Sequence, residues 1–157
     1  MRNIRFVVLG EFLLLAAILL CNVLLGGSGL SAIAWFLDLP SLLLTALVFF
    51  PGLLIMGAWK DFIKAFSVGL KPFSLPELKN IIRAVAAAQK LIICGALFAI
   101  IVSAVLLLGR MDDLSMIGSG VAVCLLSGFY AVIIEILLLP LRLNAERRLN
   151  EETDTGK

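Results

Sequence analysis

Two carboxylates interrupt long apolar stretches of this sequence, and they are the residues best placed to do chemistry inside a membrane. Glu135 lies within YAVIIEILLLP, residues 130 to 140, and Glu11 lies in an apolar stretch near the N-terminus. A charge at the centre of a bilayer costs at least about 2.5 kcal/mol and usually marks function. Two interpretations of Glu135 stay open: a proton-accessible group near the mouth of a pathway, or an interfacial group that reaches water or pairs with a partner. Glu11 is open to the same choice, because it could pair with Arg5 or take part in transport.

The other polar and sulfur-containing residues indicate structure rather than catalysis. Asp112 and Asp113 form a pair of carboxylates in the short turn RMDDLS, where we expect them to be solvated helix caps. The chain has no histidine, and its three cysteines have neither disulfide nor metal-site spacing: Cys21, Cys94 and Cys124. No nucleophile–base pair or phosphate-binding loop is recognisable in the sequence. We therefore expect no enzymatic activity, no catalytic residue, no metal and no cofactor.

The elements that must position these residues follow from the composition. The chain has 157 residues, of which 62% are hydrophobic and 15% are charged. A soluble domain of this size is about half apolar and about a quarter charged, so this chain has too little polar surface for water. A spanning helix needs about 20 mostly apolar residues. We expect an all-α integral membrane protein, a single membrane domain over residues 1–157, with four transmembrane helices at about 6–25, 42–59, 91–108 and 117–139.

The distribution of basic residues predicts the orientation of these helices. Of the 13 Lys and Arg residues, all but Arg110 lie near what becomes one side of the membrane. Because basic residues favour the cytoplasmic side, we expect both termini to be cytoplasmic in a bacterial inner membrane. The cytoplasmic parts are then the segment 60–90 and the tail 141–157. The loops 26–41 and 109–116 face outward.

Helix three, and its neighbours two and four, are expected to continue beyond the bilayer on the cytoplasmic side. SLPE, residues 74–77, is typical of a capping box, and no proline follows before Leu108. The 32 residues from Glu77 to Leu108 form about 48 Å of helix, against a hydrocarbon core of about 30 Å. Helix two is expected to continue as an amphipathic turn or two, and helix four to continue past Pro140. The last five residues, TDTGK, are expected to be disordered.

Prolines, caps and small residues shape the expected helices. Asp38 is expected to cap or turn the chain at the start of helix two, and Pro51 to kink that helix. Pro140 marks the end of the fourth span. Small residues let membrane helices approach closely, and those of helix four are expected to form one packing face. They are Gly118, Gly120, Ala122, Ser127 and Gly128.

Two pieces of the sequence resemble a known family. FLDLPSLLLTALVFFPGLLI, residues 36–55, resembles the end of the outer loop and helix two of MotA-type flagellar stator subunits, which carry a phrase like FIDxPSLLIVxGGT. GRMDDLSMIGSGVAVCLLSGFYAV, residues 109–132, followed by ILLLPLRL, resembles their outer turn and fourth helix, a phrase like NLDDPxxLGxGxAVALxxTLYG followed by LP. The resemblance covers all four helices and indicates the MotA/TolQ/ExbB proton-channel superfamily.

The resemblance implies an assembly and a mechanism. Such subunits form rings of five copies around two single-helix partner chains of the MotB or ExbD kind, which carry the titrating aspartate. Ion flow turns the ring around its partners. The chain departs from the family in its short cytoplasmic insert. The family's Gly-Thr pair of helix three falls on Ala99 and Ile100, and its threonine of helix four falls on Gly128, so the usual pathway hydroxyls are missing. Ser103 and Ser127 are the nearest substitutes, so with Glu135 they are the candidate ion-pathway residues.

Three functions remain open from the sequence. The first is a MotA-like subunit of a homo-oligomeric ion-driven motor or proton channel, expected to be a pentamer that acts with a single-helix partner. The second is a scaffold of the same fold that conducts no ions, which the missing hydroxyls and the short insert favour. The third is a small four-helix transporter, assembled as a dimer, that uses Glu11 or Glu135 as its coupling acid.

Overall fold

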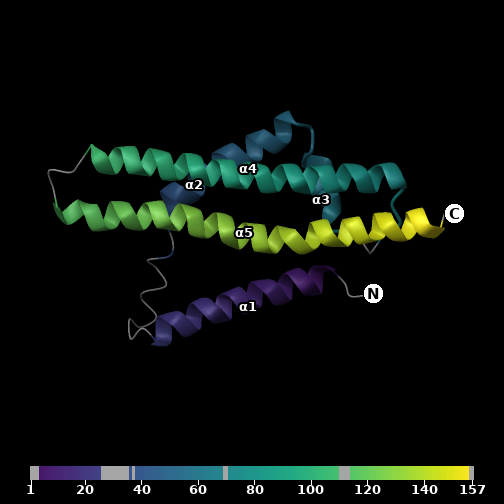
Figure 1. Ribbon diagram of the computed structural model, residues 1–157, viewed down its shortest axis with the longest axis horizontal. Coiled ribbons are helices and arrows are strands. Elements are labelled where there is room, and N and C mark those ends of the chain that lie inside the picture. The colour runs from purple at the N-terminus through teal and green to yellow at the C-terminus, as the bar shows by residue number, and fades with distance from the viewer. Residues whose placement is uncertain (1–3, 26–35, 37, 69–70, 110–113, 156–157) are drawn as a thin grey trace.

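The chain folds into five helices. The computed structural model describes residues 4–25, 36, 38–68, 71–109 and 114–155. In chain order the helices are α1 (Ile4–Leu25), α2 (Leu39–Ile55), α3 (Trp59–Ala65), α4 (Leu75–Leu108) and α5 (Leu114–Thr155) (Figure 1). Within these ranges, the only β-type pairing is an isolated bridge between Val68 and Lys71. The expected all-α class is therefore confirmed for the described residues.

The helices have the length and composition of membrane spans. Three of them, α1, α4 and α5, are long and apolar enough to cross a membrane. The bent pair of α2 and α3 makes a fourth if it is taken as one span. The chain is thus a multi-pass membrane protein, in agreement with the class expected from its composition.

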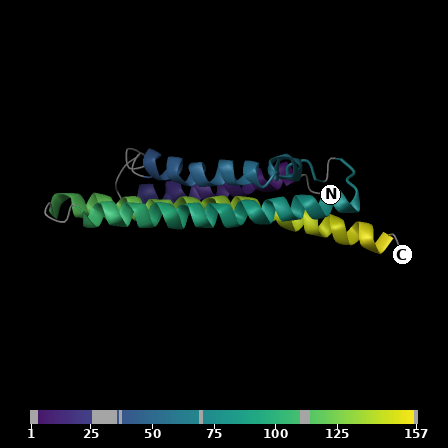
Figure 2. The ribbon, with the colours of Figure 1, turned by 90° about the horizontal axis from the view of Figure 1, so that it is seen from above.

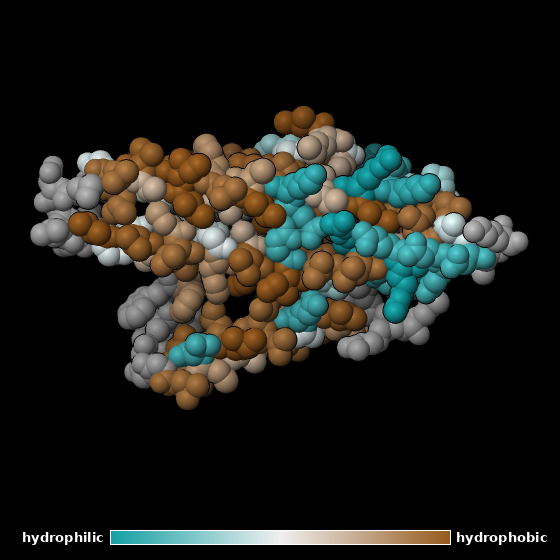
Figure 3. Space-filling model, in the orientation of Figure 1, coloured by the Kyte–Doolittle hydropathy of each residue, from teal (hydrophilic) through white to brown (hydrophobic). Residues whose placement is uncertain are grey.

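α4 and α5 form a long antiparallel hairpin, in which the two helices lie side by side (Figures 1 and 2). α4 has 34 residues and α5 has 42, so they extend for about 51 Å and about 63 Å. A hydrocarbon core is only about 30 Å thick, so both helices must continue beyond it. Hydrophilic residues gather where α4 begins and α5 ends (Figure 3). We call this region the charged end of the hairpin.

α5 continues without a break through Pro140 to Thr155. Ion pairs one turn apart support a helix, and beyond Pro140 the Arg142 Nε lies 2.9 Å from the Glu146 Oε1. The expected disorder of TDTGK is wrong for Thr153–Thr155, which complete the helix. The Thr153 hydroxyl donates to the carbonyl of Leu149 within that last turn, at 2.7 Å. The last two residues of the chain lie outside the described part.

Helix two does not continue straight into the amphipathic segment that follows it. The expected span 42–59 is instead α2, which ends at Ile55, and α3, whose axis is bent by 106° from that of α2. Gly57, at the break, has a φ of 65°, which glycine adopts without steric cost. Its N–H donates to the Leu54 carbonyl at 3.0 Å, and the next N–H donates to the Leu53 carbonyl at 3.0 Å. This is the Schellman pattern that terminates helices, and it is the physical reason for the difference.

The start of α2 is fixed by a cap. The Asp38 carboxylate accepts a hydrogen bond from the Ser41 N–H at 3.1 Å and another from the Ser41 hydroxyl. Pro40 occupies the first turn, where its missing N–H costs nothing. The expected cap is confirmed, and α2 begins at Leu39 rather than at residue 42. Pro51 lies inside α2, which continues for one more turn beyond it.

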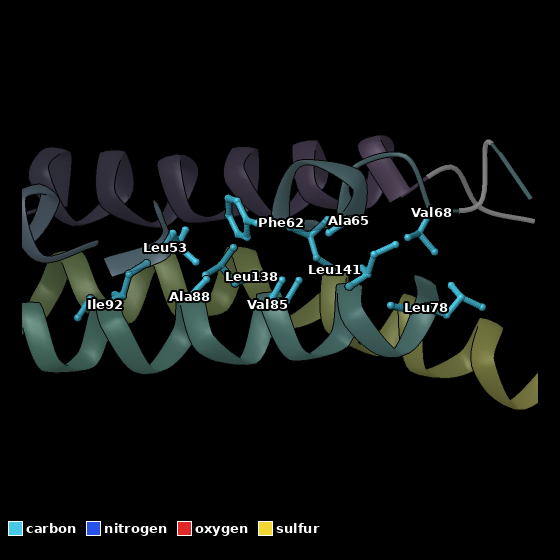
Figure 4. Packing of buried hydrophobic residues seen from close by; sticks show 14 of the residues in the cluster. Leu53, Phe62, Ala65, Val68, Leu78, Val85, Ala88, Ile92, Leu138 and Leu141 are labelled. Carbon is cyan, nitrogen blue, oxygen red and sulfur yellow. The ribbon is translucent and has the colours of Figure 1, made fainter. Parts of the chain in front are cut away.

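The densest packing lies toward the charged end of the hairpin, where α3 crosses α4 and α5 (Figure 4). Phe62 and Ala65 of α3 and Leu53 of α2 are buried there against both long helices. α1 contributes less, because Val23 is its only buried hydrophobic residue among those described. The hairpin, α2 and α3 therefore share the packed core of the fold, and α1 lies against α5 (Figure 1).

The expected capping box at the start of α4 leads to a first prediction. Glu77 Oε2 accepts from the Ser74 N–H and from the Ser74 hydroxyl, both at 3.0 Å. These bonds, with a smaller contribution from the Lys64 charge, hold the pKa of Glu77 below its ordinary value of 4.5. A carboxyl with a lowered pKa in the folded state stabilises the protein fully above that ordinary value, and the contribution is lost as the pH falls through the lowered pKa. Glu77 lies at the charged end, outside the apolar stretch 91–108.

We therefore expect Glu77→Gln to lower the thermal midpoint of unfolding at pH 7 and to have a smaller effect near pH 3. The control is Glu152→Gln, which removes an exposed carboxylate from the C-terminal end of α5. Melting curves of both variants at the two pH values test this. An equal effect of Glu77→Gln at both pH values would contradict the assignment.

Candidate functional site

A chain of polar contacts runs between α4 and α5 and begins at Glu135. The Gln89 Nε2 donates to the Glu135 Oε2 at 2.7 Å. The Arg142 Nη1 donates to the other end of the same amide, the Gln89 Oε1, at 3.4 Å. The Arg142 Nε in turn donates to the Glu146 Oε1 at 2.9 Å. We call these four residues the α4–α5 polar chain.

The helical repeat places three of the four residues on one side of α5. Glu135, Arg142 and Glu146 are separated by seven and four residues, which are about two turns and one turn of helix. Gln89 faces them from α4 and is only 9% exposed. Arg142 and Glu146 are far more exposed than Gln89, since both side chains are about two-fifths accessible. The polar chain thus connects a half-buried carboxyl with the solvent-accessible charged end.

One oxygen of Glu135 takes no part in these contacts. The Glu135 Oε1 is buried and has no hydrogen-bond partner among the described residues, and the same holds for the Glu11 Oε2 on α1. An unpaired polar atom in such a place costs about 1–3 kcal/mol, and more if it carries charge. Binding a proton or accepting a hydrogen bond relieves that cost. Each carboxyl therefore keeps one buried oxygen that could accept a hydrogen bond from a group outside the described residues.

Glu11 lies on the side of α1 that is turned toward the rest of the molecule. α1 packs against α5, and Val8, three residues before Glu11, lines the same pocket as Ile134 of α5. The two carboxyls are therefore about one helical turn or less, along their own helices, from one shared pocket. The expected pairing of Glu11 with Arg5 lies outside the described side chains.

Ser103 and Ser127, the other candidate pathway residues, lie in different surroundings. Ser127 is fully buried and its hydroxyl donates to the Val123 carbonyl of its own helix at 3.1 Å. Ser103 is half-buried and lines a pocket of about 360 Å³ together with Ser41 and Ser119. Ser127 does not line that pocket. The two serines therefore do not share this pocket.

The small residues of α5 do not form the single packing face that the sequence predicts. A Cβ added at Gly120 would lie 2.4 Å from the Leu107 Cδ1, so this glycine lets α4 approach α5 closely. A Cβ added at Gly128 would lie near Ile100 of the same helix α4. A Cβ at Gly118 would have no neighbour within 4 Å. Residues two apart on a helix point about 200° away from each other, which separates Gly118 from Gly120. Gly118 is left on an outer surface of the subunit.

Two important residues were not predicted from the sequence. Gln89 links Glu135 to Arg142. The only feature of the sequence that could have indicated this role is the presence of an amide side chain among the small and apolar residues of α4. Tyr130 is the single tyrosine of the chain, and its hydroxyl accepts from the Asp38 N–H at 2.7 Å and donates to the Phe36 carbonyl at 2.5 Å. A buried tyrosine hydroxyl usually finds such partners, and this was the available signal.

The remaining candidates complete the description. Asp112 and Asp113 lie outside the described residues, so their expected capping role has no structural counterpart here. Cys21 and Cys94 are exposed, Cys124 is half-buried, and all three are free thiols. Among the described residues, no three or more His, Cys, Asp or Glu side chains group so that they could hold a metal ion.

In comparisons with known proteins, no protein family, curated protein or solved structure matches this chain.

Proposed function

We propose that this chain is a MotA-like subunit of an ion-driven membrane complex, in which five copies form a ring that acts with a single-helix partner. The observation that carries the proposal is the contact between Gln89 and Glu135, which holds a carboxyl between the two long helices with one oxygen unpaired. The resemblance of residues 36–55 and 109–132 to stator subunits supports the same assignment. Both termini are then cytoplasmic, and the membrane is the bacterial inner membrane.

The exposed surface of the hairpin is compatible with such an assembly. Apolar side chains of the spanning parts of α4 and α5 remain exposed in the single subunit, including Phe98 at 52% and Leu125 at 70%. Gly118 lies on the same uncovered surface of α5, and small residues favour close contact between membrane helices. This surface is available to neighbouring copies, to the partner helix and to lipid.

In this proposal, Glu135 is the proton-handling group of the subunit. Gln89 orients its carboxyl, and Arg142 and Glu146 connect it to the charged end, which faces the cytoplasm. Carboxyls inside membrane segments often serve as proton relays. Glu135 lies five residues, or about 7.5 Å along the helix axis, before Pro140, so in this proposal its proton exchanges with water at the cytoplasmic side.

The subunit number is the first test of the proposal. The complex is extracted gently into lipid nanodiscs and its native mass is measured. We expect a species with five copies, with or without additional single-helix chains. A monomer or dimer that persists in every detergent and lipid would contradict the ring.

The second test is a substitution at the carboxyl. We expect Glu135→Gln to lower proton flux through reconstituted complexes at least about tenfold, because the amide still accepts from Gln89 but cannot exchange a proton at neutral pH. Glu152→Gln, at the exposed end of α5, is the matched control and should leave the flux unchanged. An unchanged flux in Glu135→Gln would remove Glu135 from the pathway, whereas a five-copy ring without any flux would favour the non-conducting scaffold.

A second candidate function is a small proton-coupled transporter. It is favoured by one observation, namely that Glu11 and Glu135 each hold a buried, unpaired oxygen on two helices that pack together. A dimeric native mass, combined with proton exchange that depends on an added substrate, would support this function over the stator-like ring.

A further inference from the structure

The Gln89 amide is held in one orientation within the α4–α5 polar chain. An arginine side chain only donates hydrogen bonds, so the amide atom that faces the Arg142 Nη1 at 3.4 Å must be the carbonyl oxygen. The amide nitrogen therefore faces Glu135, and it donates to the Oε2 of that carboxyl at 2.7 Å. Through Gln89, Arg142 thus fixes which oxygen of Glu135 accepts a hydrogen bond.

The two oxygens of the Glu135 carboxyl consequently differ. A protonated carboxyl has one carbonyl oxygen and one hydroxyl oxygen, and the carbonyl oxygen is the better acceptor. Oε2 faces an N–H donor, so it is the carbonyl oxygen of the protonated form. Oε1 is buried and has no partner among the described residues, and burying a charge without a partner is costly. A proton on Oε1 removes that charge and leaves the contact at Oε2 in place.

The polar chain cannot itself carry the proton. In a relay, each member accepts one proton and releases another. A guanidinium stays protonated in proteins and has no acceptor, and the amide of a glutamine has no ionisable group. Gln89 and Arg142 stand between the carboxyls of Glu135 and Glu146. The chain therefore holds the Glu135 carboxyl and does not connect it to Glu146 as a proton path.

The other charged side chains around Glu135 make no bond with it. Within the described residues, Glu135 forms no ion pair with a lysine or an arginine. α2 carries no charged residue along its length. The described charged side chains on the other packed helices are Glu11 of α1, Lys60, Asp61 and Lys64 of α3, and, within two turns of Gln89, Arg83 and Lys90 of α4. Among the described residues, Arg142 is thus the cation that hydrogen bonds link to the Glu135 carboxyl.

We infer that Oε1 is the atom of Glu135 that binds a proton, and that Gln89 and Arg142 are positioning residues that hold Oε2 as an acceptor. The proton comes from water, forms an O–H bond at Oε1 and returns to water from the same atom. The hydrogen bond at Oε2 persists throughout. The inference deepens the proposed function and rests on it only where proton flux is concerned.

Infrared spectroscopy of the full-length complex in nanodiscs tests the inference without a flux measurement. A protonated carboxyl gives a carbonyl stretching band, and the band of Glu135 is the one that Glu135→Gln removes from the difference spectrum between acidic and neutral pH. We expect Gln89→Leu to shift this band to higher wavenumber, because the carbonyl oxygen Oε2 loses its hydrogen bond. An unchanged band position would place the carbonyl at Oε1 and overturn the inference. The absence of any Glu135 band on acidification would overturn it as well.

Asn144→Leu is the matched control for Gln89→Leu. It removes another side-chain amide, which donates to the Val68 carbonyl at 3.1 Å and not to Glu135. We expect this variant to leave the Glu135 band in its place. The same shift in both variants would indicate a general structural change and would overturn the role of Gln89.

Arg142→Met tests the positioning role at a side chain that is 43% exposed, where the change does not threaten folding. Methionine keeps an unbranched apolar stem but cannot donate a hydrogen bond. We expect the single Glu135 band to become two, since the released Gln89 amide can turn either its N–H or its carbonyl oxygen toward the carboxyl. A single band at the original position would show that Arg142 does not fix the amide and would overturn its role.

Proton flux separates this inference from the proposed function. We expect Glu146→Gln to leave the flux through reconstituted complexes unchanged, in contrast to Glu135→Gln, because the polar chain is not the route. A loss in Glu146→Gln as large as that in Glu135→Gln would make the chain a relay and overturn the inference. If the wild-type complex carries no proton flux, the proposed function fails, while the infrared bands still decide which oxygen of Glu135 binds the proton.

Discussion

Gly95→Leu is expected to separate α2 from α4 and to give a protein that no longer folds stably. A Cβ added at Gly95 would lie 3.2 Å from the Thr45 carbonyl oxygen and 3.2 Å from the Val48 Cβ. The first of these atoms belongs to the backbone of α2, which cannot rotate away as the end of a side chain can. Overpacking of this kind costs about 1–3 kcal/mol for small additions, and the rest of a leucine side chain adds to it.

The measurement is the yield of monodisperse protein on size exclusion, followed by thermal unfolding in detergent. Gly118→Leu is the matched control, because it makes the same change at a glycine of the hairpin with no neighbour within 4 Å. We expect that variant to keep the melting temperature of a single subunit. If copies of the chain form a ring, Gly118→Leu would instead alter the native mass of the complex. Equal loss of folded protein in both variants would contradict the close contact at Gly95.

Tyr130→Phe is expected to destabilise the start of α2 by about 2–4 kcal/mol, because it removes one hydroxyl that serves two backbone groups. The Tyr130 hydroxyl bonds to the Asp38 N–H and to the Phe36 carbonyl, and the side chain is only 8% exposed. Without it, both backbone groups lose a partner where little water is available. Asp38 also caps α2 through Ser41, so we expect the cap to loosen together with the contacts of Phe36 and Asp38 to α5.

Hydrogen exchange of the first amides of α2, together with the melting temperature, measures this effect. Phe129→Leu is the control for packing, since the Phe129 ring lies 5.6 Å from the Phe36 ring but makes no hydrogen bond to the loop. We expect a smaller change in exchange at α2 for that variant. If the two variants speed exchange equally, ring packing and not the hydroxyl fixes the loop.

Local signals in the sequence were sufficient for most of the helices. The expected helix from Glu77 to Leu108 is α4, which begins two residues earlier at Leu75. This helix was predictable because its start depends on the cap at Ser74, which involves only neighbouring residues, and because no proline interrupts it after the first turn. The end of α2 was not predicted. Gly57 stands among apolar residues like any helical glycine, and its positive φ depends on hydrogen bonds to Leu53 and Leu54 that form only when α3 turns away.

The candidate site was predictable only in part, because its contacts depend on the register between two helices. Glu135 stands out in the sequence as a charge in an apolar stretch. Its partner Gln89 lies 46 residues away, and the pairing requires α4 and α5 to meet at one particular register. Close contacts such as that of Gly120 with Leu107 help to set this register. Periodicity along a single helix carries no such information, which also explains why the expected face of small residues was wrong.

The continuity of α5 has a mechanical consequence. This helix is about 63 Å long and has no break, so its two ends move as parts of one rod. A tilt of 5° about the midpoint displaces each end by about 3 Å, in opposite directions. Pro140 removes one backbone hydrogen bond, but the helix continues through it to Thr155. Arg142 and Glu146 lie just beyond Pro140, so a small rotation within the bilayer becomes a displacement of charge outside it.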